Sequence, residues 1–161
     1  MGEMIAKNRK ASKATEATMP MVVNTATLFE KYVRGRLAQR YSREGLVVRK
    51  GGTPEEFLYV DGTYGLYPDI TIARGATYAT VGDAKYKAPD AGDHYQLSTY
   101  MQAFGVEHGF LLCPVYSKDI VAVVPKVTYD RRKMFEVYLP LVDLDAAEKI
   151  LNHLHEVVPF L

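Results

Sequence analysis

An uninterrupted apolar run at residues 109–115, which reads GFLLCPV, constrains the fold more than any other segment of the chain. A strand with one face in water alternates apolar and polar residues, whereas a strand covered on both faces reads as a continuous apolar run. The segment just before it, residues 93–104, carries Leu97, Tyr100, Met101 and Phe104 on one side at helical spacing. The run therefore predicts a buried strand that follows an amphipathic helix.

Two further amphipathic helices are predicted near the ends of the chain. The first opens at Thr27, which has capping-box spacing to Glu30, and stops at Gly45. The last begins near Asp143. Their predicted inward residues are Phe29, Val33, Leu37 and Tyr41 in the first, and Leu144, Ala147, Leu151, Leu154 and Val158 in the last.

Short segments of strand character fill the space between the helices, at residues 46–49, 57–60, 66–73, 77–87, 120–124 and 134–139. Residues 66–73 and 77–87 are predicted to form a hairpin around residues 74–76. The order of elements predicts an α/β fold with a mixed central sheet flanked by helices. At 161 residues the chain predicts one domain over residues 25–161, after a flexible lead over residues 1–24.

Positive charge is concentrated between residues 31 and 50, although the formal net charge of the whole chain is only +1. Seven cations against Glu44 give this stretch a charge of +6; they are Lys31, Arg34, Arg36, Arg40, Arg43, Arg49 and Lys50. Such a stripe suits a polyanion, and it equally suits a solvated helix face. Both interpretations stay open at this point.

Nothing in the sequence indicates secretion or a membrane span, so we expect a cytoplasmic protein. The single cysteine, Cys113, cannot form a disulfide within the chain and lies inside the apolar run. We expect it to be a small buried hydrophobic residue rather than a catalytic thiol.

The chemistry centres on Pro68-Asp69 and, after thirteen intervening residues, Asp83-Ala84-Lys85. Side chains alternate along a strand, so Asp83 and Lys85 point to the same face. A hairpin centred on Ala76 places Asp69 directly opposite Asp83, with Cβ atoms roughly 4.5–5.5 Å apart. Two carboxylates and an ammonium are therefore predicted to converge on one patch of the sheet.

Two carboxylates at that distance repel, so one of them takes up a proton or the pair binds a cation. Hard oxygen ligands suit Mg²⁺, which can polarise a phosphodiester and help to generate hydroxide. Lys85 can stabilise the extra negative charge of a phosphoryl transition state. An Asp-x-Lys triplet is common in exposed strands, but here Ile70, Ile72 and Val81 indicate a polar site within a largely buried sheet.

Gln96 and Tyr100 lie four residues apart in the predicted helix after the hairpin and share a face. They can orient Lys85, a water or a phosphate. Alternatively, Gln96 belongs to the polar flank of an amphipathic helix in which Tyr100 is partly buried.

The ordered set of motifs resembles the nuclease domain of the McrC family, the endonuclease subunits of McrBC-type restriction systems. It consists of LFEKYV at 28–33, LYPDI at 66–70, GDAKYK at 82–87 and YQLSTY at 95–100, and the resemblance spans about residues 27–115. It implies a PD-(D/E)xK, restriction-endonuclease-like core. It also implies that Asp69, Asp83 and Glu30 bind the metal, that Lys85 is the catalytic lysine, and that Gln96 and Tyr100 support it.

The resemblance further implies cleavage of double-stranded DNA with Mg²⁺, or with Mn²⁺ as a substitute. In such systems a separate GTP-hydrolysing AAA+ motor recognises the 5-methylcytosine, and this chain has no P-loop of its own. Pairing of two copies to cut both strands is left open.

One departure bears on the partner. Family members usually carry an N-terminal region that docks onto the motor, and only about two dozen residues precede the first predicted helix here. This predicts a truncated chain or a stand-alone relative. A repair or junction-processing nuclease of the same superfamily, and a DNA-binding or assembly module without catalysis, are the alternative functions.

Overall fold

The structure is a computed structural model that describes residues 24–51, 56–117 and 122–161. Apart from Asn24, the predicted lead over residues 1–24 lies outside the described residues, and so do Ile120 and Val121 in the strand predicted at 120–124. None of the helices in the described ranges has both the length and the apolar character that crossing a bilayer requires.

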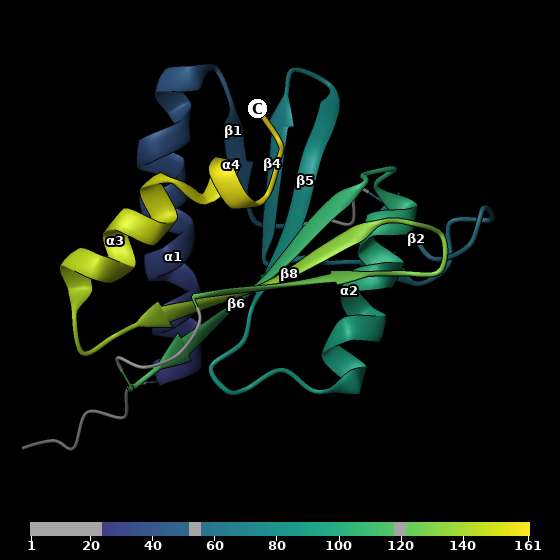
Figure 1. Cartoon of the computed structure of the whole chain (residues 1–161). Coiled ribbons are helices and arrows are strands. Elements are labelled where there is room, and N and C mark those ends of the chain that lie inside the picture. Colours follow the sequence, from purple (N-terminus) through teal and green to yellow (C-terminus); the bar gives the residue numbers. More distant parts are fainter. Residues whose placement is uncertain (1–23, 52–55, 118–121) are drawn as a thin grey trace, which may run out of the picture.

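A six-stranded mixed sheet forms the centre of the molecule, as the order of elements predicts (Figure 1). Its strand order is β1-β4-β5-β6-β8-β7, in which β5, β6 and β8 run parallel and the other neighbours are antiparallel. The strands are β1 (Val47–Arg49), β4 (Ile70–Arg74), β5 (Thr77–Ala84), β6 (His108–Val115), β7 (Val123–Val127) and β8 (Lys133–Pro140). A separate pair joins β2 (Glu56–Phe57) to β3 (Gly65–Leu66).

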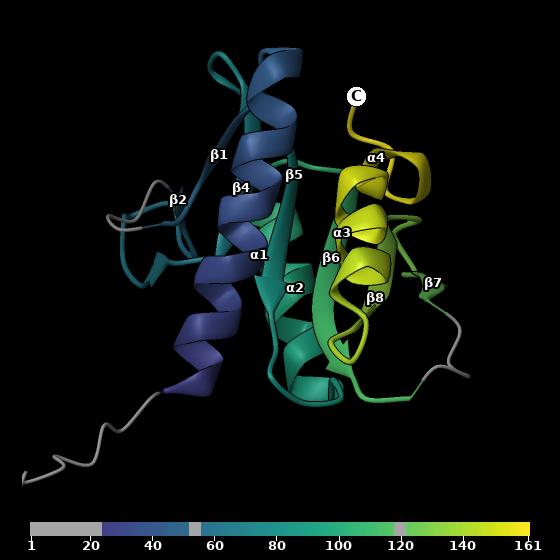
Figure 2. The same cartoon turned by 90° about the vertical axis from the view of Figure 1, so that its left-hand side faces the viewer.

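Helices cover both faces of this sheet (Figure 2). One face packs against α1 (Thr25–Tyr41), α3 (Leu144–Asn152) and α4 (Leu154–Val157), and the other against α2 (Ala91–Ala103). The 3₁₀ helix η1 (Ser42–Glu44) continues α1 to Gly45, whose φ of 72° ends the helix in the left-handed region where glycine is favoured.

Strand β6 lies inside the sheet, which explains its continuous apolar sequence. Phe110 and Leu112 join the core under α1 and α3, whereas Leu111 and Cys113 join the core under α2. Burial raises the pKa of the Cys113 thiol to about 12, so it remains protonated and unreactive at neutral pH. The prediction of a buried, structural cysteine agrees with this environment.

Gly82 is the one residue of β5 at which a side chain has no room. A Cβ atom there would lie 2.2 Å from the ring of Phe110 on the adjacent strand β6. The missing side chain lets the Phe110 ring lie across β5, and the following residue is Asp83. β5 and β6 therefore approach closely at the residue next to Asp83.

The β4–β5 hairpin has the register that the sequence predicts at its open end, for a reason that the sequence does not reveal. Next to the turn, Arg74 pairs with Thr77 and Ala73 with Tyr78, but beyond an irregularity Ile72 pairs with Thr80 and Ile70 with Gly82. This bulge places one extra residue, Ala79, on β5. Continued by one step, the shifted register sets Asp69 against Asp83.

Three local predictions are wrong. The N-cap of α1 is Asn24, which accepts a hydrogen bond from the Thr27 amide at 3.1 Å, so Thr27 and Glu30 form no capping box. The strand predicted at 57–60 is limited to Phe57, because residues 58–60 leave the strand and are exposed. Leu144 is 57% exposed rather than inward, since it is the first residue of α3 directly after the Asp143 cap.

Helix α2 begins two residues before its predicted start. Asp90 caps it and forms a reciprocal capping box with Asp93. The residues predicted to face the core from this helix, Leu97, Tyr100, Met101 and Phe104, are all buried. The predicted inward residues of the last helix are likewise buried after Leu144, although the helix is divided at His153 into α3 and α4.

Candidate active site

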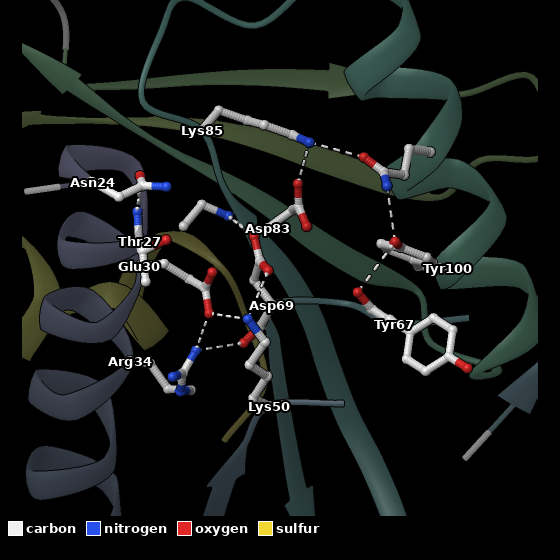
Figure 3. A network of polar contacts seen from close by, with 12 residues as sticks. Asn24, Thr27, Glu30, Arg34, Lys50, Tyr67, Asp69, Asp83, Lys85 and Tyr100 are labelled. Carbon is white, nitrogen blue, oxygen red and sulfur yellow. Dashed lines mark hydrogen bonds and ion pairs between the residues drawn. The ribbon is translucent and has the colours of Figure 1, made fainter. Parts of the chain in front are cut away.

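The residues singled out in the sequence lie at the open end of the β4–β5 hairpin, between the first turns of α1 and α2 (Figure 3). Asp69 directly precedes β4, Asp83 lies near the end of β5, and Lys85 follows β5. The backbone amide of Lys85 donates to the carbonyl of Leu112 at 2.9 Å, which fixes the end of β5 against β6. The hairpin thus presents its polar residues from a well-anchored backbone.

Asp69 and Asp83 form a closely spaced carboxylate pair. Burial, and then the negative charge of Asp83, raise the pKa of Asp69 to about 7, although a 3.2 Å hydrogen bond from the Ala84 amide to its Oδ2 favours the ionised form. Asp83 is only 3% exposed. A proton or a cation is therefore needed to relieve the repulsion within this pair.

Lys85 approaches the pair from the α2 side. Its ammonium lies 2.5 Å from Asp83 Oδ2 and 3.2 Å from Asp93 Oδ1, and it donates to Gln96 Oε1 at 2.8 Å. Burial alone would lower the pKa of Lys85, but the contacts with Asp83 and Asp93 outweigh it and raise the pKa. Lys85 is therefore held as a fixed positive charge.

The contact between Lys85 and Asp83 is an ion pair rather than a well-directed hydrogen bond. Asp83 Oδ2 is completely buried and, within the described part of the chain, accepts no hydrogen bond of good geometry. A buried carboxylate oxygen that accepts no well-directed hydrogen bond is rare in folded proteins.

Gln96 and Tyr100 continue the network away from Lys85. The Gln96 amide donates to the Tyr100 hydroxyl at 2.9 Å, and that hydroxyl donates to the Tyr67 carbonyl at 3.3 Å. Tyr100 is 6% exposed, and burial together with the charge of Asp83 raises the pKa of its hydroxyl. Gln96 and Tyr100 thus link Lys85 through hydrogen bonds to the Tyr67 carbonyl, two residues before Asp69.

Glu30 lies on the opposite, α1 side of the site. Its Oε1 is 2.5 Å from the Arg34 guanidinium and in short contact with the Lys50 ammonium. Burial would raise the pKa of Glu30, but these two cations outweigh it and hold the pKa below its usual value. Arg34 also donates to the Asp69 carbonyl at 3.4 Å, so Glu30 is close to the carboxylate pair without joining it.

Three residues of this site were not identified as such from the sequence. In the sequence, Lys50 and Arg34 stand out only as members of the basic stretch, and no functional role is predicted for Asp93. A signal for Asp93 existed, because Asp90 and Asp93 have capping-box spacing and Asp93 lies three residues before Gln96 on the same helix face. Lys50 offered no such signal, since its position depends on how β1 pairs with β4.

The basic stretch itself is largely neutralised within the protein. At least four of its seven cations form ion pairs, because Arg36 contacts Glu148 at 2.6 Å and Arg40 contacts Glu44 at 2.9 Å, in addition to the pairs of Arg34 and Lys50 with Glu30. This pairing favours the solvated-face interpretation for most of the stretch. Arg34 and Lys50 are the members that contact Glu30 at the site.

The carboxylate pair has the chemistry of a divalent-cation site, with two hard oxygen donors and the unsatisfied Asp83 Oδ2. Within the described ranges, however, no three Asp, Glu, His or Cys side chains come close enough together to hold a metal ion. Asp69 and Asp83 therefore fit the predicted role as they stand. Glu30 can complete the set only after it leaves Lys50 and Arg34.

Comparisons with known proteins give the family and a structural neighbour of this chain. The family model described as "McrBC 5-methylcytosine restriction system component" matches residues 1–117. Among solved structures, the chain resembles one in a half-complex of Thermococcus gammatolerans McrB AAA+ hexamers with bound McrC, with a TM-score of 0.59 and 17% identity. The alignment covers 84% of this chain but 34% of that one, so the present chain spans about a third of its length.

At that level of identity the structural match establishes a shared fold, whereas the family match extends over most of the sequence. No curated protein matches the chain. On the strength of the family model, the chain belongs to the family of McrBC 5-methylcytosine restriction system components.

Proposed function

We propose that this chain is a divalent-metal-dependent DNA endonuclease with a PD-(D/E)xK core. The observation that carries the proposal is the convergence of Asp69, Asp83 and Lys85 at the open end of one hairpin, with the buried Asp83 Oδ2 in ion contact with the Lys85 ammonium but without a well-directed hydrogen bond. Repelling carboxylates beside a fixed ammonium destabilise the empty site, and a bound cation facing a phosphodiester would relieve that repulsion.

In this proposal Asp69 and Asp83 hold Mg²⁺, for which Mn²⁺ can substitute. When bound, such an ion polarises the phosphodiester and lowers the pKa of a coordinated water. Asp83 Oδ2 would be a metal-ligating oxygen that is already buried from solvent. Asp69 would release the proton that it retains near pH 7. Glu30 is a third ligand only if its two cations release it.

Lys85 provides positive charge to the non-bridging oxygens of the phosphoryl group as negative charge develops on them. Its ammonium is held by Asp83, Asp93 and Gln96, so little reorganisation accompanies the reaction. The Gln96 amide is in turn held by Tyr100, which is bound to the Tyr67 carbonyl. We assign Gln96 and Tyr100 to positioning Lys85 rather than to contact with the reacting atoms.

The biological context follows from the family and the structural neighbour. Membership in the McrBC family and similarity to a chain solved with McrB hexamers support a restriction-system component that works with a McrB-like AAA+ motor. We propose double-stranded DNA containing 5-methylcytosine as the substrate, with recognition of the modified base on the partner. The nuclease centre itself engages the phosphate backbone, which carries no direct sequence information.

Cleavage of supercoiled and linear plasmid, with and without 5-methylcytosine, tests the proposal. The purified chain is assayed with Mg²⁺, Mn²⁺ or EDTA, alone and with the McrB-like partner and GTP. We expect metal-dependent cutting that Asp83→Asn abolishes. Asp145→Asn, on the exposed start of α3, is the matched control and should cut at the parent rate. Lack of cutting under all these conditions, or equal cutting by Asp83→Asn, would overturn the proposal.

A further inference from the structure

Lys50 occupies an unusual place for a surface lysine. It follows β1, and its ammonium reaches inward between two carboxylates, in short contact with Glu30 Oε1 and 3.9 Å from Asp69 Oδ1 (Figure 3). Its side chain is 46% exposed, whereas that of Glu30 is 14% exposed and that of Asp69 is 22% exposed. The flexible, half-exposed Lys50 side chain therefore reaches from solvent to the less exposed carboxylates of Glu30 and Asp69.

Lys50 is one of three cations that offset the negative charge of this site. Arg34, Lys50 and Lys85 lie against four carboxylates, those of Glu30, Asp69, Asp83 and Asp93. A divalent ion bound at Asp69 would add two positive charges within a few ångströms of the Lys50 ammonium. Repulsion at that distance and in partly buried surroundings opposes metal binding for as long as the Lys50 ammonium stays in place.

Only one of the three resident cations is free to leave. Lys85 is bound to Asp83, Asp93 and Gln96, and Arg34 is bound to Glu30 and to the Asp69 carbonyl. Lys50 instead has a long flexible stem and direct access to solvent. While it lies between Glu30 and Asp69, these two carboxylates cannot converge on one ion, in keeping with the lack of a three-ligand cluster in the described ranges.

We propose that Lys50 is a resident competitor for the divalent cation, whose ammonium holds Glu30 and Asp69 until a metal ion displaces it. The proposal rests on the metal site assigned under the proposed function. Once displaced, the ammonium swings to the solvent side of the site, where a DNA phosphate can accept it. Metal loading is thereby coupled to release of a cation towards the substrate.

Metal binding by the full chain without DNA tests this role, with Mn²⁺ as the probe and its Kd measured by electron paramagnetic resonance and by calorimetry. We expect Lys50→Met to bind Mn²⁺ about tenfold more tightly than the parent, which corresponds to ~1.4 kcal/mol. Lys126→Met is the matched control, because Lys126 is 48% exposed and pairs with Glu136 at 3.3 Å on β8. Its Kd should equal that of the parent.

The shift in Tm caused by Mn²⁺ gives a second measurement. It should be larger for Lys50→Met than for the parent, and Lys50→Gln, which removes the charge but keeps a polar side chain, should behave in the same way if the Met variant folds poorly. An unchanged or weaker Kd in both variants, with the parent still binding through Asp83, would overturn the role of Lys50 alone. Absence of Mn²⁺ binding in the parent and in every Lys50 variant would overturn the metal site as well.

Discussion

Two lysines approach one pair of carboxylates from opposite sides, and their surroundings differ sharply. On the α2 side, Lys85 is 18% exposed and has three partners, one of which is itself fixed by Tyr100. On the α1 side, Lys50 is 46% exposed and lies 3.9 Å from Asp69. The difference teaches that burial and the rigidity of the partners, rather than residue type, separate a permanent charge from an exchangeable one.

The largest expected effect comes from removing the permanent charge. Lys85→Ala should reduce single-turnover cleavage on the order of 10²–10³-fold, the usual cost of losing a preorganised group that stabilises transition-state charge. Mn²⁺ binding should be no weaker than in the parent, because Lys85 is not a ligand. Cleavage at the parent rate would mean that the two lysines do not differ as proposed.

A substitution at Gly82, next to Asp83, tests how tightly β5 packs against β6 on the Lys85 side of the site. Gly82→Ala would drive a Cβ atom into the Phe110 ring, and overpacking of this kind typically destabilises by about 1–3 kcal/mol. Gly35→Ala on α1 is the control, since a Cβ atom there meets nothing within 4 Å and helix propensity favours alanine. Urea unfolding should therefore place the two variants on opposite sides of the parent.

A smaller loss is expected when the support of Lys85 is weakened but the lysine is retained. Tyr100→Phe removes the hydroxyl that accepts from Gln96 and donates to Tyr67, and should lower cleavage by roughly tenfold, as for other supporting residues of metal sites. The Kd for Mn²⁺ should stay at the parent value. A change in the Kd for Mn²⁺ with no change in the cleavage rate would mean that Tyr100 acts on metal binding, as Lys50 does, and not on Lys85.

The smallest effect concerns stability and pH in EDTA. The folded pKa of Asp69, about 7, lies above its ordinary value of 3.8, so between these values the folded state retains a proton that the unfolded chain has lost. Stability should therefore be fully present below about pH 4 and should fall as pH rises towards 7. Asp69→Asn should lessen that decline, raising Tm at pH 8 by roughly 2–4 °C over the parent. Parallel Tm profiles would contradict the assignment.

Much of this arrangement could be predicted from local pattern. The sequence places Asp83 and Lys85 on one face and Gln96 four residues before Tyr100. The structure brings each pair into contact, although β5 ends at Ala84 and not at the predicted residue 87. The role of Glu30 was harder to predict, because its three-residue spacing from Thr27 is also typical of a capping box at the start of a helix. Asn24 takes the cap instead, and two cations distant in sequence or in the next turn compete for the Glu30 carboxylate.

Lys50 could not be placed from the sequence, because its position depends on tertiary pairing. Arg49 lies opposite Thr71 across the β1–β4 pair, and this register, continued by one residue, sets Lys50 opposite Ile70, from where its ammonium reaches Asp69. No periodicity within residues 46–50 encodes that neighbour. The residue with the weakest sequence signal is thus the one whose contacts support the exchangeable part of the site.

The bulge at Ala79 determines which residues of β4 and β5 lie opposite each other, and so restricts the lengths of the two strands. A two-residue turn pairs positions whose numbers sum to 151, and the one inserted residue raises that sum to 152, the value shared by Asp69 and Asp83. Loss of a single residue from β5 would turn one carboxylate towards the α1 core while leaving the other in place. Insertions and deletions in this hairpin therefore keep the two carboxylates together only as matched changes on both strands, which leave the interval between Asp69 and Asp83 an even number of residues.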